Sequence, residues 1–324
     1  MFPAVLALVL AACGTGQAST ADHHRLQVVT TVSPITSLVA DVAGGLVDVR
    51  GLVPEGADSH TYEPKPSAAK SLASADVVFV NGLRLEDPTK DLAAKNLRPG
   101  AEIVELGTQT ITPDREIFDF SFPRAAGKPN PHLWTNPPYA KRYAEIAADV
   151  LARRDPADAA AFHANEARLA ERIDELDAAM KTATATLPPE RRVLLTYHDA
   201  YAYFADHYGW RVIGAIQVSS FEDPTPQEVA KLIAQIKQEK VPAIFGSEVF
   251  PSPVLAEIGK ETGVRYVDKL RDDDLPGGPG DADHSWLGLM RSDFVTMVTA
   301  MGGDASALQR LDIAGGHDAA TYPQ

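Results

Sequence analysis

Four short stretches of this sequence carry side chains that could ligate a metal ion. His60 lies in a polar loop, His132 stands between prolines and a tryptophan, and His198 follows an apolar run expected to be a strand. Asp268 ends another such run. Three imidazole nitrogens and one carboxylate form a four-coordinate set that suits Zn²⁺. Because four protein donors leave no open position on the ion, the set favours holding a metal over activating water.

The expected positions of these residues support a common site. All four are expected at the carboxyl ends of strands or in the loops that follow, which is where open α/β sheets bind ligands. Glu248 ends one more apolar run, and we expect it to face the site of these four residues and to orient a ligand histidine. Without an HExxH or paired CxxC motif, such spacing alone is a weak signal.

One long helix, predicted from Asp155 to Leu187, must position the two halves of the chain. Asp155 can serve as its N-cap, and the Pro188-Pro189 pair cannot continue it. Between them, apolar residues recur at helical spacing along one stripe, namely Phe162, Leu169, Ile173, Leu176 and Met180. At about 1.5 Å per residue the helix would be roughly 45 Å long, enough to act as a rigid strut across two domains.

The sequence repeats on either side of this helix. Val28 to Val53 and Val193 to Val218 each have the pattern of an apolar strand, an amphipathic helix that ends at a glycine, and a second strand. Two further apolar runs follow in each half, at 75–82 and 101–107 and at 241–248 and 264–270. Strands that alternate with helices indicate parallel sheets. We therefore predict an α/β fold of two pseudo-symmetric lobes, each with about four parallel strands, bridged by one long rigid helix.

Length and composition fit this organisation. A chain of 324 residues with 45% apolar and 23% charged residues can bury two cores. The net charge of -14 argues against nucleic acid and anionic membrane surfaces as partners. The predicted segments are a signal peptide over 1–12, a flexible tether over 13–25, an N-terminal lobe over 26–154, the bridging helix over 155–187, a C-terminal lobe over 188–312 and a tail over 313–324.

The N-terminal stretch predicts the compartment. Residues 1–12 are almost wholly apolar, too few to span a bilayer, and lead through small residues to Cys13, the only cysteine. This pattern resembles the bacterial lipoprotein processing site, at which the cysteine is acylated. We therefore expect an extracytoplasmic protein, at the cell surface or in the periplasm, held at the membrane only by a lipid anchor on Cys13 and without a disulfide.

Two motifs give the chain a family resemblance. Asp58 to Pro64 match the pattern D-x-H-x-[YF]-E-P, and Asn130 to Trp134 match [DN]-P-H-x-W. On these motifs the chain resembles the zinc- and manganese-binding solute-binding lipoproteins of bacterial ABC importers, also called cluster A-I or metal-binding adhesin-like receptors. The resemblance extends from Leu26 to about Met301. It implies two pseudo-symmetric lobes joined by one long helix, with the metal in the cleft between them.

The same resemblance implies a ligand set and a function. His60 and His132 fall in the two motifs, and His198 falls at a third position that is His or Glu in the family. Asp268 is the best match to a fourth, acidic position. The expected function is capture of Zn²⁺ as cargo and its delivery to an importer permease with its ATPase. We expect a monomer without enzyme activity, and a metallochaperone is left open as a further partner.

Protonation and the other histidines complete this prediction. Imidazole of ordinary pKa predicts weaker metal binding below about pH 6.5. His163 and His207 fall within expected helices, so we do not predict them as ligands.

Other functions stay open at this point. A manganese or dual-metal receptor is the nearest alternative, because carboxylate suits Mn²⁺ and Asp268 could bind in a bidentate manner. A metal-dependent surface adhesin is a second alternative. A metallohydrolase with Asp268 or Glu248 as base is a third, although no nucleophile motif such as GxSxG is present. His198 favours zinc, since it makes the donor set rich in nitrogen.

Two loops bear on metal capture. The stretch before the second motif, 112–130, contains acidic residues but no histidine, which removes any argument for a histidine-rich gathering loop. Arg271 to Trp286 contain five Asp and His284. We interpret this second stretch as a solvated acidic loop in preference to a metal-capturing lid.

Overall fold

Two parallel sheets form the framework of the protein. The computed structural model describes residues 25–216, 224–247, 253–314 and 319–323. The first sheet has the strand order β2-β1-β3-β4 and the second the order β6-β5-β7-β8. The strands are β1 (Gln27–Thr30), β2 (Asp48–Gly51), β3 (Val77–Val80), β4 (Glu102–Glu105), β5 (Val193–Thr196), β6 (Arg211–Ala215), β7 (Ala243–Ser247) and β8 (Arg265–Leu270).

The two sheets repeat one topology. In each sheet the first strand of the lobe pairs in parallel with the second and the third, and the fourth strand pairs with the third. The strand order is therefore the same in both sheets when it is counted within each lobe. In the chain, four parallel strands precede the long helix and four follow it, which confirms the fold class predicted from the repeat.

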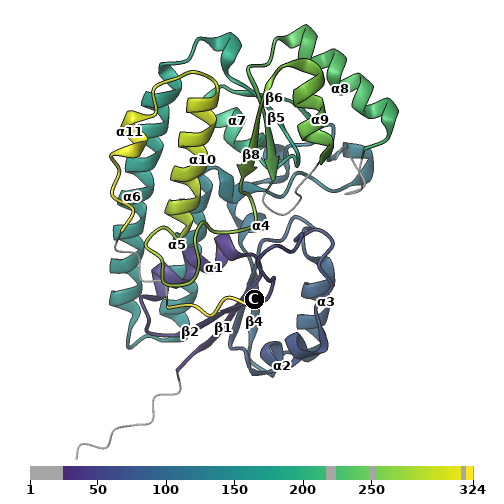
Figure 1. The fold of residues 1–324 in the computed structure, drawn as a ribbon. Helices are drawn as coiled ribbons and strands as arrows, with labels where there is room; N and C mark the ends of the chain where they lie inside the picture. Colours follow the sequence, from purple (N-terminus) through teal and green to yellow (C-terminus); the bar gives the residue numbers. More distant parts are fainter. Residues whose placement is uncertain (1–24, 217–223, 248–252, 315–318, 324) are drawn as a thin grey trace, which may run out of the picture.

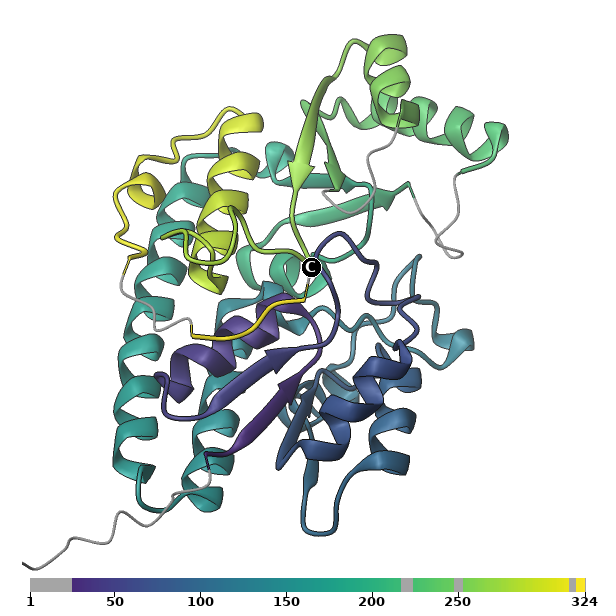
Figure 2. The same cartoon turned by 60° about the horizontal axis from the view of Figure 1, so that its bottom comes forward.

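Helices cover both faces of the sheets. In Figures 1 and 2 the pairs α2–α3 and α8–α9 lie on one side of the sheets, and α6 lies on the opposite side. Among the described residues no helix is long and apolar enough to cross a membrane. The helices are α1 (Ser33–Ala43), α2 (Pro66–Ser74), α3 (Asp87–Asn96), α4 (Leu106–Thr110), α5 (Pro137–Arg154), α6 (Ala159–Ala185), α7 (Ala202–Tyr208), α8 (Pro226–Glu239), α9 (Pro253–Thr262), α10 (Trp286–Ala300) and α11 (Ser306–Gln309), with short 3-10 turns η1 (Pro113–Arg115), η2 (Arg124–Ala126), η3 (Leu133–Thr135) and η4 (Pro189–Arg191).

The long helix begins later than the sequence predicted. α6 has 27 residues, which corresponds to about 40 Å, and Asp158 stands at its N-cap. Asp155, the predicted cap, instead ends α5, where its backbone N–H donates to the carbonyl of Leu151. The Asp-Pro pair belongs to a short turn that joins two packed helices. Figure 1 shows α6 running beside elements of both lobes, and it packs on α1 as well as on α10 and α11.

One apolar core joins the two lobes. Buried residues of the first sheet, of the helices that lie between the lobes and of the second sheet form a single cluster, whose members include Val28, Trp134, Ile173, Phe245 and Phe294. Two smaller clusters lie under the α2–α3 and α8–α9 pairs. Because a close-packed apolar interior resists relative motion of its parts, the lobes are held as one unit.

The C-terminal segment returns to the first lobe. Thr321 forms a parallel bridge with Arg50 of β2. The backbone N–H of Gly51 donates to the carbonyl of Thr321 at 3.0 Å, and the N–H of Thr321 donates to the carbonyl of Val49 at 2.9 Å. A segment that follows the second lobe in sequence thus extends the edge of the first sheet, which adds a second link between the lobes.

Ile173→Ala should lower the free energy of unfolding by about 3 kcal/mol, because removal of a buried side chain leaves a cavity. Ile173 is 1% exposed and lies on α6 within the shared core. Urea unfolding followed by circular dichroism measures the change. Glu175→Ala, at an exposed position of the same helix, is the matched control and should stay within about 0.5 kcal/mol of the wild type. Equal effects of the two substitutions would contradict a central packing role for α6.

Candidate metal centre

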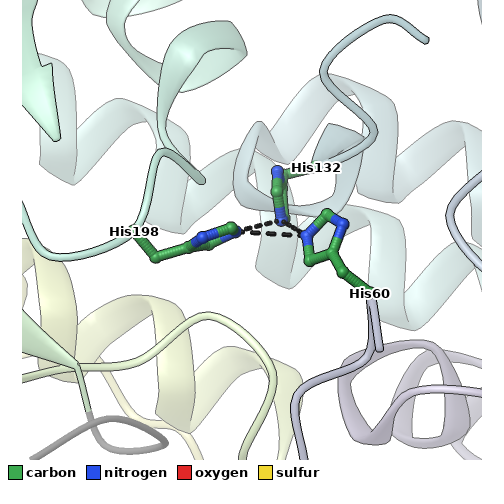
Figure 3. Close-up of side chains that lie close together, drawn as sticks. All are labelled: His60, His132 and His198. Atoms are coloured by element: carbon green, nitrogen blue, oxygen red, sulfur yellow. Dashed lines mark hydrogen bonds between the residues drawn. The ribbon is translucent and has the colours of Figure 1, made fainter. Parts of the chain in front are cut away.

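Three histidine side chains from separate segments converge on one point. Their Nε2 atoms lie 3.0 Å apart for His60 and His132, 3.2 Å for His60 and His198, and 3.0 Å for His132 and His198. Figure 3 shows each ring pointing one nitrogen at the other two. Within the described residues, this is the cluster of His, Cys, Asp or Glu side chains placed to hold a metal ion. The structure thus brings together the three histidines that the sequence predicted as ligands.

The His132 ring is oriented by Asn130. The side-chain oxygen of Asn130 accepts from the backbone N–H of His132 at 3.2 Å and from its ring Nδ1 at 2.8 Å. Because an amide oxygen can only accept, Nδ1 carries the proton and Nε2 keeps its lone pair toward the cluster. The amide nitrogen of Asn130 donates to the backbone oxygen of Asp199 at 2.9 Å, which holds the His132 loop against the chain beside His198.

His60 and His198 each follow the end of a strand. His60 lies in the loop after β2, where Asp58 accepts the backbone N–H of His60 and the hydroxyl of Thr61, both at 2.8 Å, as in an Asx turn. His198 follows β5, and its backbone oxygen accepts from the hydroxyl of Thr196 at 2.6 Å. Local hydrogen bonds in the loops after β2 and β5 therefore position both residues.

The loop that carries His60 is also bound to the second lobe. The backbone N–H of Ser59 donates to the carboxylate of Asp273 at 3.1 Å, and that of Gly56 donates to Asp274 at 2.7 Å. Charged acceptors form stronger hydrogen bonds than neutral ones. Two carboxylates of the second lobe thus fix the position of a ligand supplied by the first.

Burial keeps the three imidazoles neutral. Desolvation lowers the pKa of His198 to about 4 and the pKa values of His60 and His132 well below their usual range. Neighbouring positive charge lowers them further, from His198 and Lys128 for His60, and from His198 and His60 for His132. Neutral imidazole is the form that binds metal, so the nitrogens are available at neutral pH.

The structure does not bring Asp268, the predicted fourth ligand, into this cluster. Asp268 lies within β8 with an exposed side chain, and it is not one of the clustered donors. The prediction assumed that the strand ended there, whereas β8 continues to Leu270. Asp272, just after the strand, is 5% exposed and places Oδ2 3.8 Å from Nε2 of His198. In the sequence, the signal that could have pointed to Asp272 was the run of three aspartates directly after the strand.

The acidic stretch of the second lobe differs from the solvated loop that the sequence predicted. Asp272, Asp273 and Asp274 are 5%, 5% and 7% exposed, because they pack where the two lobes meet. His284 is buried as well, and its Nδ1 donates to the carbonyl of Pro276 at 3.2 Å. The aspartates at the start of this stretch therefore belong to the inter-lobe contact.

The remaining candidates lie elsewhere. Glu248 and Cys13 are outside the residues that the structure describes. His163 is exposed on α6, and Nε2 of His207 lies 2.7 Å from the carboxylate of Asp177. Neither histidine belongs to the cluster.

The spacing of the three nitrogens fits a metal ion. Zinc–nitrogen bonds of about 2.0–2.1 Å at tetrahedral angles place neighbouring nitrogens about 3.3 Å apart. The observed separations of 3.0 to 3.2 Å come within a few tenths of an ångström of that value. A cation between the nitrogens would give each lone pair a partner, so the cluster can bind such an ion with little rearrangement of the rings.

Most of the chain matches one known family. The model of the family described as zinc-uptake complex component A, periplasmic, matches residues 28–300. The chain belongs to this family. Among curated relatives, the manganese-binding lipoprotein MntA of Halalkalibacterium halodurans is 27% identical over 298 residues, which cover 92% of this chain and 96% of that protein. The manganese ABC transporter substrate-binding lipoprotein PsaA of Streptococcus pneumoniae is 27% identical over 280 residues, covering 86% and 90%.

A solved structure of a relative has the same fold. The periplasmic zinc-binding protein TroA of Treponema pallidum aligns with a TM-score of 0.77 at 28% identity, covering 86% of this chain and 99% of that one. A manganese-bound periplasmic metal-binding protein from Candidatus Liberibacter asiaticus aligns with a TM-score of 0.74 at 24% identity, covering 86% and 100%, and supports the fold alone.

Family membership establishes the class of function. The protein is the extracytoplasmic, metal-binding component of an ABC importer, and it is not an enzyme. A component of this kind implies a membrane permease and an ATPase as partners. The resemblance stated from the sequence motifs is confirmed, and the metallohydrolase alternative is excluded.

Loss of a ligand histidine should weaken zinc binding more than loss of Asn130, which orients the His132 ring. His60→Ala, His132→Ala or His198→Ala should each lower zinc affinity about a hundredfold or more, since each removes one metal–nitrogen bond. Asn130→Ala keeps the nitrogen but frees the His132 ring, and should lower affinity about 10- to 100-fold. His163→Ala, at an exposed position, is the control and should change nothing. Chelator competition measures the series, and equal losses in control and cluster variants would refute the site.

The lowered pKa values predict that zinc binding survives mild acid. The sequence alone predicted that binding weakens below about pH 6.5. A histidine with a depressed folded-state pKa stays neutral until the pH falls to that lower value, about 4 for His198. Three imidazoles of ordinary pKa would lose about a thousandfold in affinity between pH 7 and 5.5. We expect a loss below about tenfold. Chelator competition at both pH values, with circular dichroism to verify folding, measures it; a thousandfold loss would show that the rings titrate normally.

Proposed function

We propose that this receptor captures Zn²⁺ and delivers it to its importer. The observation that carries the proposal is the triangle of three Nε2 atoms, 3.0 to 3.2 Å apart, on neutral imidazoles. Imidazole nitrogen suits Zn²⁺, whereas carboxylate oxygen suits Mn²⁺, and zinc is also the stronger binder at most mixed sites. Three nitrogens therefore favour zinc.

We propose His60, His132, His198 and Asp272 as the donor set, with Asp272 in place of Asp268. The carboxylate of Asp272 is buried and lies 3.8 Å from a ligand nitrogen, a separation close to that of two donors on one ion. The position of its backbone is supported by the indole N–H of Trp134, which donates to the Asp272 carbonyl at 2.8 Å. With one carboxylate and three neutral imidazoles, the zinc-loaded site carries one net positive charge.

A manganese receptor is the second candidate. MntA and PsaA are named as manganese proteins, whereas TroA is named as zinc-binding. A bidentate carboxylate at Asp272 would raise the coordination number and supply a second oxygen, which suits Mn²⁺. The proposed set still contains more nitrogen than carboxylate, and for that reason we place zinc first.

The other parts of the proposal concern anchoring and assembly. Cys13 carries the lipid that holds the receptor at the membrane, a proposal supported by the lipoprotein names of MntA and PsaA. The N-terminal lobe over 26–154 and the C-terminal lobe over 188–312 act as one monomeric unit. A metallochaperone partner and a secondary role as surface adhesin stay predictions.

The wild type should hold one equivalent of zinc and keep it when challenged with equimolar Mn²⁺, because the nitrogen-rich set favours zinc. His198→Glu replaces one nitrogen with carboxylate oxygen, so it should lower zinc affinity about tenfold or more and allow Mn²⁺ to compete. His163→Glu adds the same charge at an exposed site and is the matched control. Bound-metal analysis after equilibrium dialysis measures all three proteins. If the wild type exchanged its zinc for equimolar Mn²⁺, the manganese candidate would replace the zinc proposal.

A further inference from the structure

The backbone around Asp272 is held by the same stretches of chain that carry two of the ligand histidines. Tyr201 lies three residues after one of them, and its hydroxyl is hydrogen-bonded to the carbonyl oxygen of Arg271. Trp134 lies two residues after another, and its indole N–H donates to the carbonyl of Asp272 at 2.8 Å. The peptide groups before and after Asp272 are therefore both fixed from the ligand-bearing segments.

Asp293, on α10, completes this anchor. Its Oδ1 and Oδ2 atoms accept the backbone N–H of Arg271 at 3.2 and 3.1 Å, and Oδ2 lies 2.8 Å from the hydroxyl of Tyr201. Because a hydroxyl has one proton, Tyr201 shares it between this carboxylate and the Arg271 carbonyl. Tyr201 and Asp293 are 2% and 1% exposed, so the loss of either group leaves buried polar atoms without a partner.

A fixed backbone limits where the Asp272 carboxylate can lie. An aspartate side chain is short and has few rotamers, so the position of its backbone largely sets the position of its oxygens. Here Oδ2 lies 3.8 Å from Nε2 of His198, which allows one oxygen to complete a four-coordinate set with three nitrogens. A backbone free to move toward the imidazoles would let both oxygens bind the ion. The higher coordination number would suit Mn²⁺ better than Zn²⁺.

We propose that Tyr201 is a positioning residue that determines metal specificity. Its hydroxyl holds the segment of Asp272 so that the carboxylate offers one oxygen to the ion, and this restricts the site to the four-coordinate geometry of zinc. The inference rests on the proposed donor set and adds the residue that controls its coordination number. Asp293 acts together with Tyr201, since it holds the same segment from α10.

Tyr201→Phe removes the hydroxyl and keeps the buried ring. It should lower the ratio of zinc affinity to manganese affinity about tenfold, because the released segment can bring both carboxylate oxygens to the ion. Equilibrium dialysis against each metal, with bound-metal analysis, measures the ratio.

The visible absorption of bound Co²⁺ gives a second readout. Cobalt in a four-coordinate site absorbs strongly, and it absorbs weakly at higher coordination numbers. The absorption per bound cobalt should therefore fall in Tyr201→Phe. A hydroxyl that served stability alone would leave the spectrum of the loaded protein unchanged, so this measurement separates positioning from a structural role.

Tyr208→Phe is the matched control. Tyr208 is also buried and also donates to a carboxylate, that of Asp177 on α6 at 2.9 Å, outside the segments that carry the ligands. Its removal should leave both the affinity ratio and the cobalt spectrum as in the wild type. Asp293→Ala should reproduce the effect of Tyr201→Phe. Asp293→Asn should have a smaller effect, because its amide oxygen can still accept the N–H of Arg271.

Asp272→Ala separates the inference from the proposed function. If this variant loses zinc affinity but Tyr201→Phe keeps the wild-type ratio and spectrum, or if Tyr208→Phe shifts them equally, the inference is overturned and the zinc receptor stands. If Asp272→Ala binds zinc as tightly as the wild type, the proposed donor set fails, and the inference with it. Circular dichroism of the metal-free proteins checks that each variant is folded.

Discussion

Three imidazole rings that must stay neutral while their nitrogens lie within 3.2 Å of one another are the constraint on which the rest of the structure depends. In water each ring could take up a proton or turn away from the others. Here burial lowers their pKa values, and a buried polar group is costly unless its remaining polar atoms are bonded. The ring of His132 meets this condition through Asn130, whose own amide group is bonded in turn to Asp199.

This requirement explains why the lobes contact each other at the site. The first lobe supplies the loop that carries His60. The carboxylates of Asp273 and Asp274 in the second lobe accept hydrogen bonds from backbone N–H groups of that loop. Behind these loops, α6 and a shared apolar core hold the two sheets in one arrangement. A ligand cluster assembled in this way needs only local adjustment of loops when the ion enters or leaves, since the sheets share one core.

The sequence predicted what is encoded locally. The strand, helix and strand of each repeat were predictable because each copy carries its own signals, including Gly44 and Gly209, which end α1 and α7 in the left-handed conformation. The three histidines were found because each stands in a short, distinctive stretch after a strand. The prediction took Asp268 as the residue that ends its strand, although the apolar run extends to Leu270, and β7 pairs with β8 as far as that residue.

The aspartates after β8 show the limit of local reasoning. Three consecutive aspartates have the composition of a solvated loop, and only partners distant in sequence justify their burial. For Asp274 and Asp273 these partners include the N–H groups of Gly56 and Ser59, more than 200 positions away in the chain. No pattern within Asp272 to Asp274 indicates that such donors exist. Because the sequence does not show which aspartates are buried, the fourth donor could be sought only among the acidic residues near the end of the strand. Asp268 is the first of these residues in the chain, and it was chosen.

The buried aspartates also have an electrostatic consequence for the metal. A dication that leaves water for a buried site loses solvation that neutral imidazoles cannot replace with charge, so negative charge must be nearby. Asp272 lies 3.8 Å from His198, and Asp273 and Asp274 follow it. The negative charge that a buried dication requires is therefore supplied by the second lobe, nearest to the ligands at Asp272.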